Sequence, residues 1–359
     1  MSRKERLNQL FEAPEAVLPR YGLVYVDDRD FPIQRIGHGK GFSYKLRGRP
    51  LKSKKQLERI RELAIPPAWK HVKITDLANG HLQAVGRDKR DRKQYRYHPG
   101  WSKVRNSTKF YNMAAFGQIL PSIRKRVERD LDQKGWPRTK VLALVVGLLE
   151  ETHIRIGNRQ YARENKTYGL STLRKKHVEV QTGSMQFEFT GKKGKKHIVG
   201  LRNKKLIRLV HRSMDIPGWE LFQYYGPEGE KKSLDSSMVN AYLHEIGNDH
   251  FTAKDFRSWG ASLIFFNTLM ELGTTSHEKE IRDNLSLAYD AGAKALGNTK
   301  TVCRNHYVHP FLNSAYRDGS IKAYFDSSGK QSGEGEYFSR SEALMLKLIK
   351  KYRPDGPNT

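Results

Sequence analysis

The hydrophobic pattern of this 359-residue chain changes its period about a third of the way along. Short runs of β-forming residues dominate the first hundred residues, whereas long segments with helical spacing follow from about residue 108. A sheet and a helical body need different repeats, so the change predicts two domains that meet near residues 101–107. The expected fold class is α+β, with a small β-rich N-terminal domain before a mainly α-helical one.

The N-terminal part carries four candidate strands and one candidate helix. The strands are expected at residues 22–26, 42–44, 82–85 and 94–97. Residues 54–64 have helical spacing, and Ile65-Pro66-Pro67 ends that helix.

The longer second part is mostly helical but contains one strand-rich segment. Helices are expected at residues 110–120, 123–131, 139–152, 237–246 and 259–272. Strands at 178–180, 187–189 and 197–199, separated by glycine-containing turns, predict a three-stranded meander. The expected domain limits are 1–103, 104–325, and a C-terminal tail of 326–359 that contains a short helix.

The charge of the chain points to an acidic partner. It has 66 Lys plus Arg against 38 Asp plus Glu, a formal net charge of +28, and nucleic acid is the commonest partner of such proteins. A hydrophobic content of 37% is enough to form a core, so a disordered polycation is excluded. The longest apolar stretch, residues 141–149, is too short to cross a membrane and indicates a buried helix.

Several common kinds of site are missing from the sequence. Its single cysteine, Cys303, excludes an internal disulfide framework and a cysteine-based zinc site. The phosphate-binding loop, the dinucleotide fingerprint and the two-histidine zinc helix are also not found. We therefore expect no cofactor and no metal, and any chemistry on nucleic acid must come from side chains.

Two basic clusters stand out along the chain. Residues 86–97 read GRDKRDRKQYRY, in which cations alternate with Tyr95 and Tyr97 on one face of a strand. Such a surface can contact phosphates and bases, although a solvated edge strand is the ordinary alternative. The second cluster surrounds Lys192 on a turn between two strands, and taken alone it is typical of a solvated or phosphate-contacting turn.

An ordered series of motifs resembles the type IB DNA topoisomerases, especially their compact bacterial and poxvirus-like branch. The series spans roughly residues 20–320, and its combination is far more specific than any one motif. In chain order it comprises IPPAW (65–69), GRDKRDRKQY (86–95), HIRIG with Arg155, FTGKKGKKH with Lys192, KDFRSWGAS with Arg257 and GNTKTVCRNHY with Tyr307.

The resemblance implies a role for each matching residue. Tyr307 matches the nucleophile that becomes joined to the 3′ end of the broken strand, a step that conserves the phosphodiester energy and needs no ATP. Arg155 and Arg257 match cations that stabilise the phosphate in the transition state. Lys192 matches the general acid for the 5′ oxygen. Asn298 stands nine residues before Tyr307, where many members have histidine; it can donate a hydrogen bond but cannot carry a proton.

The resemblance also implies a partner, which is double-stranded DNA gripped by a monomeric clamp without a membrane or small-molecule cofactor. The expected DNA-binding residues are Arg92, Lys93, Gln94, Tyr95, Tyr97 and Tyr161. An amide such as that of Gln94 suits the adenine edge in the major groove. The expected location is the cytoplasm of a bacterium, at the nucleoid.

Two other functions remain open from the sequence. A site-specific tyrosine recombinase would use the same phosphotyrosyl chemistry, but there a histidine typically precedes the second arginine by three residues, where this chain has Lys254. A non-enzymatic DNA-binding protein explains the charge but not the spacing of the four motif residues. Each of those residues also has an ordinary explanation; Arg155, for example, could pair with Glu150 or Glu151.

Overall fold

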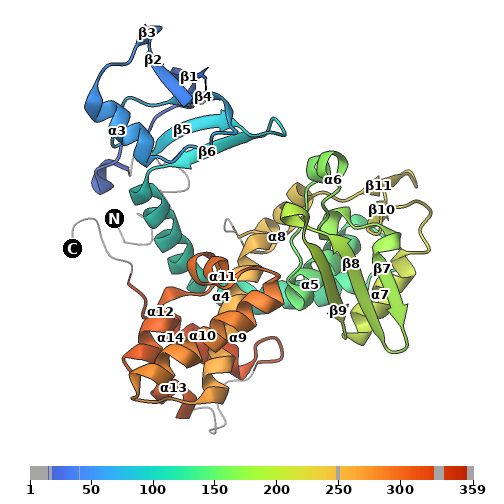
Figure 1. Ribbon diagram of the computed structural model, residues 1–359. Helices are drawn as coiled ribbons and strands as arrows, with labels where there is room; N and C mark the ends of the chain where they lie inside the picture. The colour runs from blue at the N-terminus through green and yellow to red at the C-terminus, as the bar shows by residue number, and fades with distance from the viewer. Residues whose placement is uncertain (1–14, 16–17, 40, 248–250, 327–334, 354–359) are drawn as a thin grey trace. The chain divides into compact units, whose positions relative to one another are not determined.

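The structure is a computed structural model that describes residues 15, 18–39, 41–247, 251–326 and 335–353. The chain forms two compact units: unit 2 covers Asn112–Tyr352, and unit 1 comprises the residues up to Tyr111 together with Arg353. The division falls inside one long helix, α4 (Pro99–Leu131) (Figure 1). The α+β class expected from the sequence is confirmed, while the domain limits drawn from it stay a prediction.

Unit 1 contains an antiparallel sheet of six strands in the order β3-β2-β1-β4-β5-β6. Helix α3 (Lys54–Glu62) begins at the cap residue Ser53 and packs on the sheet through Ile60. Together with Ile33, Val72, Ile74 and Ala84, Ile60 forms the hydrophobic cluster between this helix and the sheet. The strands are β1 (Ile33–His38), β2 (Gly41–Leu46), β3 (Arg49–Pro50), β4 (Lys70–Ile74), β5 (Leu82–Arg87) and β6 (Lys93–Tyr97).

The prediction of a strand at residues 22–26 is wrong. Only Val24 makes an isolated bridge there, to Gly80, and the flanking residues form the short 3-10 helices η1 (Leu18–Tyr21) and η2 (Asp28–Asp30). The β-branched composition of the segment reflects local propensity, but no neighbouring strand pairs with it. Strands β1 and β4 were not foreseen, because charged residues interrupt their apolar pattern.

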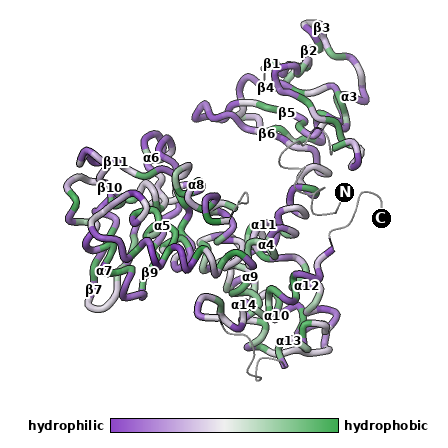
Figure 2. Tube along the Cα trace, turned by 180° about the vertical axis from the view of Figure 1, so that it is seen from behind, coloured by the Kyte–Doolittle hydropathy of each residue, from purple (hydrophilic) through white to green (hydrophobic). Residues whose placement is uncertain are grey.

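Unit 2 is mainly helical and is built around α5 (Arg138–Thr152). Ten of its fifteen residues are buried, which explains the uninterrupted apolar run seen in the sequence. Figure 2 shows hydrophobic residues along the central helices of this unit. The other helices are α6 (Arg159–Asn165), α7 (Lys204–Ser213), α8 (Ser236–Gly247), α9 (Ala253–Leu272), α10 (Glu278–Leu296), α11 (Lys300–His306), α12 (Pro310–Arg317), α13 (Lys322–Asp326) and α14 (Arg340–Ile349).

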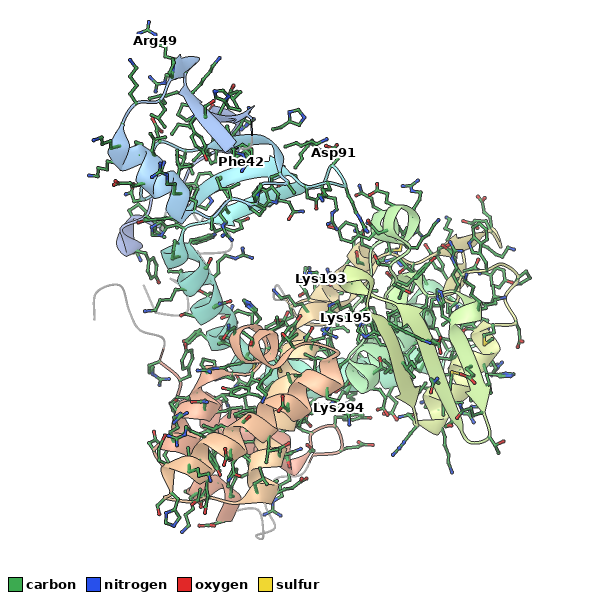
Figure 3. The ribbon with its side chains drawn as sticks, in the orientation of Figure 1. Phe42, Arg49, Asp91, Lys193, Lys195 and Lys294 are labelled. Atoms are coloured by element: carbon green, nitrogen blue, oxygen red, sulfur yellow. The ribbon has the colours of Figure 1, made fainter. Side chains whose placement is uncertain are left out.

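The predicted meander is present as β7 (Val178–Gln181), β8 (Ser184–Thr190) and β9 (Lys196–Leu201), all antiparallel. A short turn, η5 (Lys192–Gly194), joins β8 to β9. Figure 3 shows Lys193 and Lys195 on this turn. A separate two-stranded ribbon is formed by β10 (Gln223–Tyr225) and β11 (Lys231–Ser233).

The two helices expected at residues 110–120 and 123–131 are one continuous helix, α4, and Pro121 lies inside it without ending it. The buried residues Phe116, Leu120, Ile123 and Val127 continue on both sides of the proline. Their packing compensates for the one backbone hydrogen bond that proline removes.

The helix expected in the C-terminal tail is α14, and a buried ionic cluster attaches it to the body of unit 2. Arg124 of α4 binds Glu342 at 2.6 Å and Glu150 at 2.5 Å. Trp259 of α9 donates its indole N–H to Glu342 at 2.9 Å. This cluster therefore joins α4, α5, α9 and α14.

Candidate active site

Arg155 lies in the extended segment that follows α5. The helix ends at Thr152, and His153 adopts a left-handed conformation with φ of 52° that redirects the chain. The carbonyl of Arg155 accepts a hydrogen bond from the N–H of Leu170 at 2.9 Å. A Cβ at Gly169 would lie only 2.4 Å from that carbonyl oxygen, so the close approach of these segments requires glycine. The side chain of Arg155 then donates to Asn298 Oδ1 at 2.7 Å.

Arg257 lies near the start of α9, which is capped by Thr252 together with Asp255. Its side chain is 4% exposed. One terminal nitrogen donates to the carbonyl of His153, and the other donates to the carbonyl of Leu296 at 3.0 Å. Burial, followed by the positive charge of Arg155, lowers the pKa of Arg257 to about 10. The group therefore remains charged at neutral pH in a fixed orientation.

Tyr307 immediately follows α11 and is half-buried. The guanidinium of Arg257 lies 5.3 Å from the centre of its ring. Burial by itself would raise the pKa of Tyr307, but the charges of Arg257 and Arg155 and their hydrogen bonds outweigh it and lower the pKa below 10. A phenol in these surroundings loses its proton more easily, which suits a nucleophile.

Asn298 follows the end of α10, where Gly297 adopts a left-handed conformation with φ of 61°. The backbone N–H of Asn298 donates to Ala293 at 2.9 Å, and its Oδ1 accepts the bond from Arg155. Within the described part of the chain, Asn298 Nδ2 and Arg257 Nε are buried without a hydrogen-bond partner. Buried unsatisfied donors are costly, so their presence here is consistent with an anionic ligand.

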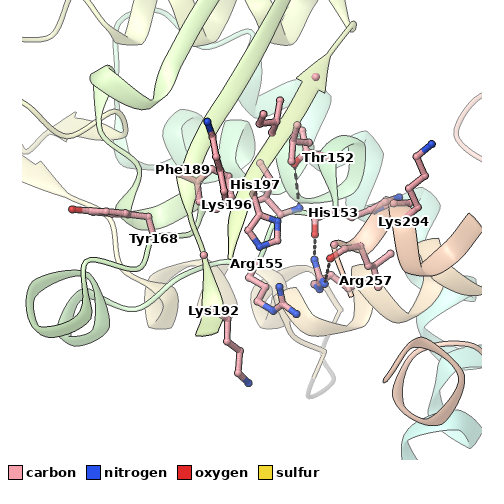
Figure 4. Close-up of a pocket in the computed structure, with 18 residues that line it drawn as sticks. Thr152, His153, Arg155, Tyr168, Phe189, Lys192, Lys196, His197, Arg257 and Lys294 are labelled. Carbon is pink, nitrogen blue, oxygen red and sulfur yellow. Dashed lines mark hydrogen bonds between the residues drawn. The ribbon is translucent and has the colours of Figure 1, made fainter. Parts of the chain in front are cut away.

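Lys192 is the first residue of the β8–β9 turn, and its side chain is exposed. It lines a pocket of about 390 Å³ together with Arg155 and Arg257 (Figure 4). The four residues Arg155, Arg257, Asn298 and Tyr307 are linked by direct side-chain interactions, and Lys192 borders the same pocket.

Two histidines of this pocket received no role from the sequence, although both lie in the quoted motifs. His153 begins HIRIG, and burial followed by the charge of Arg257 lowers its pKa to about 4. His197 ends FTGKKGKKH, and burial followed by neighbouring cations also lowers its pKa. Both imidazoles are neutral at pH 7. Their place in the motifs was the available sequence signal, but only the fold brings them to the pocket.

Cys303 is buried on α11 against Gly292 of α10. Burial raises the pKa of its thiol to about 11, so the thiolate is scarce at neutral pH. Cys303 therefore packs between these helices rather than reacts.

The expected DNA-binding residues of unit 1 lie on and beside β6. Tyr95 and Tyr97 share one face, with ring centres 6.0 Å apart and nearly parallel planes. The neighbouring polar groups already have internal partners. Arg92 and Gln94 both bind Asp88, at 2.6 Å and 3.0 Å, and Lys93 forms an ion pair with Asp28. Figure 2 shows the β5–β6 turn as strongly hydrophilic.

Tyr161, the remaining expected DNA-binding residue, lies on α6 of unit 2. Its side chain is 46% exposed. Its backbone N–H donates a hydrogen bond to Oδ1 of Asn158 at 3.1 Å, and Asn158 thereby caps the start of α6. The ring is therefore available to a ligand of this surface.

No metal-binding cluster of three or more His, Cys, Asp or Glu residues occurs in the described ranges. None of the described helices combines the length and the apolar character that a membrane span requires.

Two family models match the chain. Residues 98–318 match the catalytic core of eukaryotic DNA topoisomerase I, and residues 41–88 match the N-terminal domain of bacterial DNA topoisomerase IB. Together they cover strands β2 to β5 of the unit 1 sheet and most of unit 2, including every residue of the pocket.

Individual proteins show the same likeness. The DNA topoisomerase 1B of Acanthamoeba polyphaga mimivirus is 31% identical over 308 residues, which cover 84% of this chain and 89% of the relative. The DNA topoisomerase 1 of rabbit fibroma virus is 25% identical over 277 residues, covering 69% and 83%. The DNA topoisomerase I of Monkeypox virus is 22% identical over 236 residues, covering 65% and 72%.

Proposed function

This chain belongs to the type IB DNA topoisomerases, and from that premise we propose that Tyr307 is its nucleophile and that Arg155, Lys192, Arg257 and Asn298 assist it. The protein is a DNA isomerase that relaxes supercoiled duplex DNA through transient cleavage of one strand and religation. The observation that carries the assignment is the placement of the Arg257 guanidinium over the Tyr307 ring, with Arg155 bound to Asn298 beside them.

The cleavage step begins at the phenol of Tyr307. Its oxygen forms a bond to the scissile phosphorus, its proton passes to solvent, and the bond from phosphorus to the 5′ oxygen breaks. Lys192 gives a proton to the departing 5′ oxygen. Religation runs the same steps in reverse, with the 5′ hydroxyl as nucleophile and Tyr307 as leaving group. Each step exchanges one phosphodiester bond for another, so the bond energy is conserved and the cycle needs no ATP.

The cations stabilise the charge that builds up on the non-bridging oxygens. Arg257 is held by two backbone carbonyls and cannot reorient easily, so it provides a preorganised positive charge. Arg155 is fixed by Asn298. The buried Nδ2 of Asn298 supplies a neutral hydrogen bond where a histidine would supply a charged one.

The DNA contacts belong to the same proposal. The chain acts as a monomer that grips the duplex through phosphate contacts, and the formal charge of +28 supports this. The exposed rings of Tyr95 and Tyr161 are the side chains best able to contact DNA without first breaking an internal ion pair. For Arg92 and Lys93, DNA binding requires exchange of Asp88 and Asp28 for phosphate.

The cellular setting is also proposed. Bacterial origin and a place at the cytoplasmic nucleoid are supported by the match of residues 41–88 to a bacterial domain. The relatives described above are viral, and therefore support the activity rather than the source.

The test is relaxation of supercoiled plasmid in chelator and without ATP, by the parent and by Tyr307→Phe. We expect the parent to relax the plasmid and the variant to lose the activity by at least about 10⁴-fold, because phenylalanine has no nucleophilic oxygen. Tyr225→Phe, which alters an exposed tyrosine of β10, is the matched control and keeps parental activity. Relaxation by Tyr307→Phe at the parental rate would show that another residue is the nucleophile.

A further inference from the structure

We propose that His197 is a positioning residue for strand cleavage. Its flat ring sets the spacing between the turn that carries Lys192 and the end of α10 that carries Asn298. The inference rests on the function proposed above, and it adds a residue to which that proposal assigns no role.

One edge of the His197 ring contacts the turn at Gly191, the residue directly before Lys192. A Cβ built at Gly191 would lie 2.5 Å from His197 Cδ2 and 2.7 Å from Nε2. The backbone of Gly191 has φ of −99° and ψ of −162°, which any residue can adopt. Glycine is therefore required at this position by the imidazole and not by the backbone conformation.

The opposite edge of the ring contacts the end of α10 at Gly297. A Cβ there would lie 2.6 Å from His197 Cε1 and 2.8 Å from Nδ1. Gly297 directly precedes Asn298, and it directly follows Leu296, whose carbonyl binds Arg257 at 3.0 Å. The ring thus separates two glycines, one beside Lys192 and one beside the groups that hold Arg257 and Arg155.

The ring is fixed in this position from a third side. It stacks on Phe189 of β8 with ring centres 5.3 Å apart and planes at 11°, and the two residues face each other across the strand pair. Burial and the nearby cations keep the imidazole neutral. A neutral, stacked ring between two glycines acts as a spacer, and Figure 4 shows it among the residues that line the pocket.

The chemistry requires such a spacer. Lys192 must reach the 5′ oxygen while Arg155, Arg257 and Asn298 contact other oxygens of the same phosphate. These groups come from a strand-connecting turn, from the segment after α5 and from helix ends far apart in the sequence. A displacement of about 1 Å in catalytic geometry can cost about 100-fold in rate. Loss of the spacer therefore misplaces the proton donor relative to the phosphate.

The experiment measures single-turnover cleavage with saturating protein. The duplex is designed so that the short fragment with the new 5′ hydroxyl dissociates after cleavage, which prevents religation. We expect His197→Ala to cleave between about 10- and 100-fold more slowly than the parent, with unchanged DNA affinity. A second substrate replaces the departing 5′ oxygen by sulfur. A thiolate leaves without protonation because a thiol pKa is near 8.5, so this substrate should recover most of the lost rate.

Gly191→Ala provides an independent test of the contact. Alone, it should slow cleavage because its Cβ collides with the ring. In the double variant Gly191→Ala/His197→Ala the collision is gone, and cleavage should be faster than in Gly191→Ala alone, a non-additive result. His177→Ala is the control for loss of a buried histidine in the same unit, and it should lower the thermal midpoint without slowing cleavage.

Three results would overturn the proposal. They are parental cleavage by His197→Ala, an equal loss on the oxygen and sulfur substrates, and strictly additive effects of the two alanine substitutions. Tyr307→Phe run in parallel separates this failure from that of the proposed function. If Tyr307→Phe is inactive and His197→Ala is unimpaired, only the role of His197 is wrong.

Discussion

Replacement of Arg257 by lysine keeps the positive charge but changes its geometry. The parent guanidinium binds the carbonyls of His153 and Leu296 with two different nitrogens while facing the ring of Tyr307. An ammonium is a single point of charge on a flexible stem and cannot meet all three requirements. The substitution therefore distinguishes the contribution that the positive charge makes to cleavage from the contribution that its orientation makes.

The expected loss of stability follows from the carbonyl that lysine leaves unbound. A buried acceptor without a partner costs about 1–3 kcal/mol. For a unit of this size, each kcal/mol lowers the thermal midpoint by about 2–4 °C, so the midpoint should fall by about 2–12 °C. The expected loss of cleavage is larger, about 100- to 1000-fold, which is typical when one preorganised donor to a developing negative charge is removed.

The assay is single-turnover cleavage at saturating protein, with thermal unfolding of the same samples. Arg317→Lys is the matched control, because Arg317 is exposed on α12 and pairs with Glu278 at 3.2 Å. We expect that control to cleave at the parental rate. If Arg257→Lys cleaves within about tenfold of the parent, orientation contributes less than about 1.4 kcal/mol and the reasoning from the two carbonyls is refuted.

Further predictions concern pH, stability and salt. Arg155→Gln removes one of the cations that lower the pKa of Tyr307, so that pKa should rise. The rising limb of the cleavage pH profile, which follows ionisation of the phenol, should then move to higher pH; a downward move would contradict the electrostatic account. Arg124→Met leaves the buried carboxylate of Glu342 and the partly exposed carboxylate of Glu150 without their shared cation. It should destabilise unit 2 by about 3–5 kcal/mol in a denaturant titration, whereas a loss below about 1 kcal/mol would argue against the ionic cluster. His153 and His177 have pKa values of about 4 in the folded state, whereas a histidine in the unfolded chain has a pKa of about 6.5. Between these values the unfolded state binds more protons, so the thermal midpoint should fall as pH decreases from 7 towards 4. A constant midpoint would show that these rings are not buried as described. The DNA-binding constant of Tyr307→Phe, followed by fluorescence anisotropy, should fall with salt at a log–log slope of about −0.9 per phosphate contacted, and a flat response would refute electrostatic gripping.

Local sequence signals located most of the elements, and the resemblance of the motif series to the type IB topoisomerases supplied all of the proposed reacting groups. The apolar run at residues 141–149 predicted the buried helix α5, because a helix that is hydrophobic all round must be buried. Glycines between short β-rich runs predicted the β8–β9 turn with Lys192. The same kind of signal failed at residues 22–26 and missed β1, because strand formation depends on a partner that local composition does not reveal.

The sequence could not show which polar groups neutralise one another. Arg92, Lys93 and Gln94 look free for DNA in the motif, but the fold pairs them with Asp88 and Asp28. These partners lie on a tight turn and on a neighbouring 3-10 helix, so their proximity is a product of the fold.

The sequence alone, through its resemblance to the type IB topoisomerases, indicated the proposed reacting groups and their order, from Arg155 through Lys192 and Arg257 to Tyr307, and its charge indicated an acidic partner. Only the tertiary structure decided how these groups meet. Arg155 reaches Asn298 across 143 positions of the chain, and His197 fits between Gly191 and Gly297. Periodicity and propensity act over one or two turns of chain, whereas such contacts depend on how α5, α9, α10 and the meander pack.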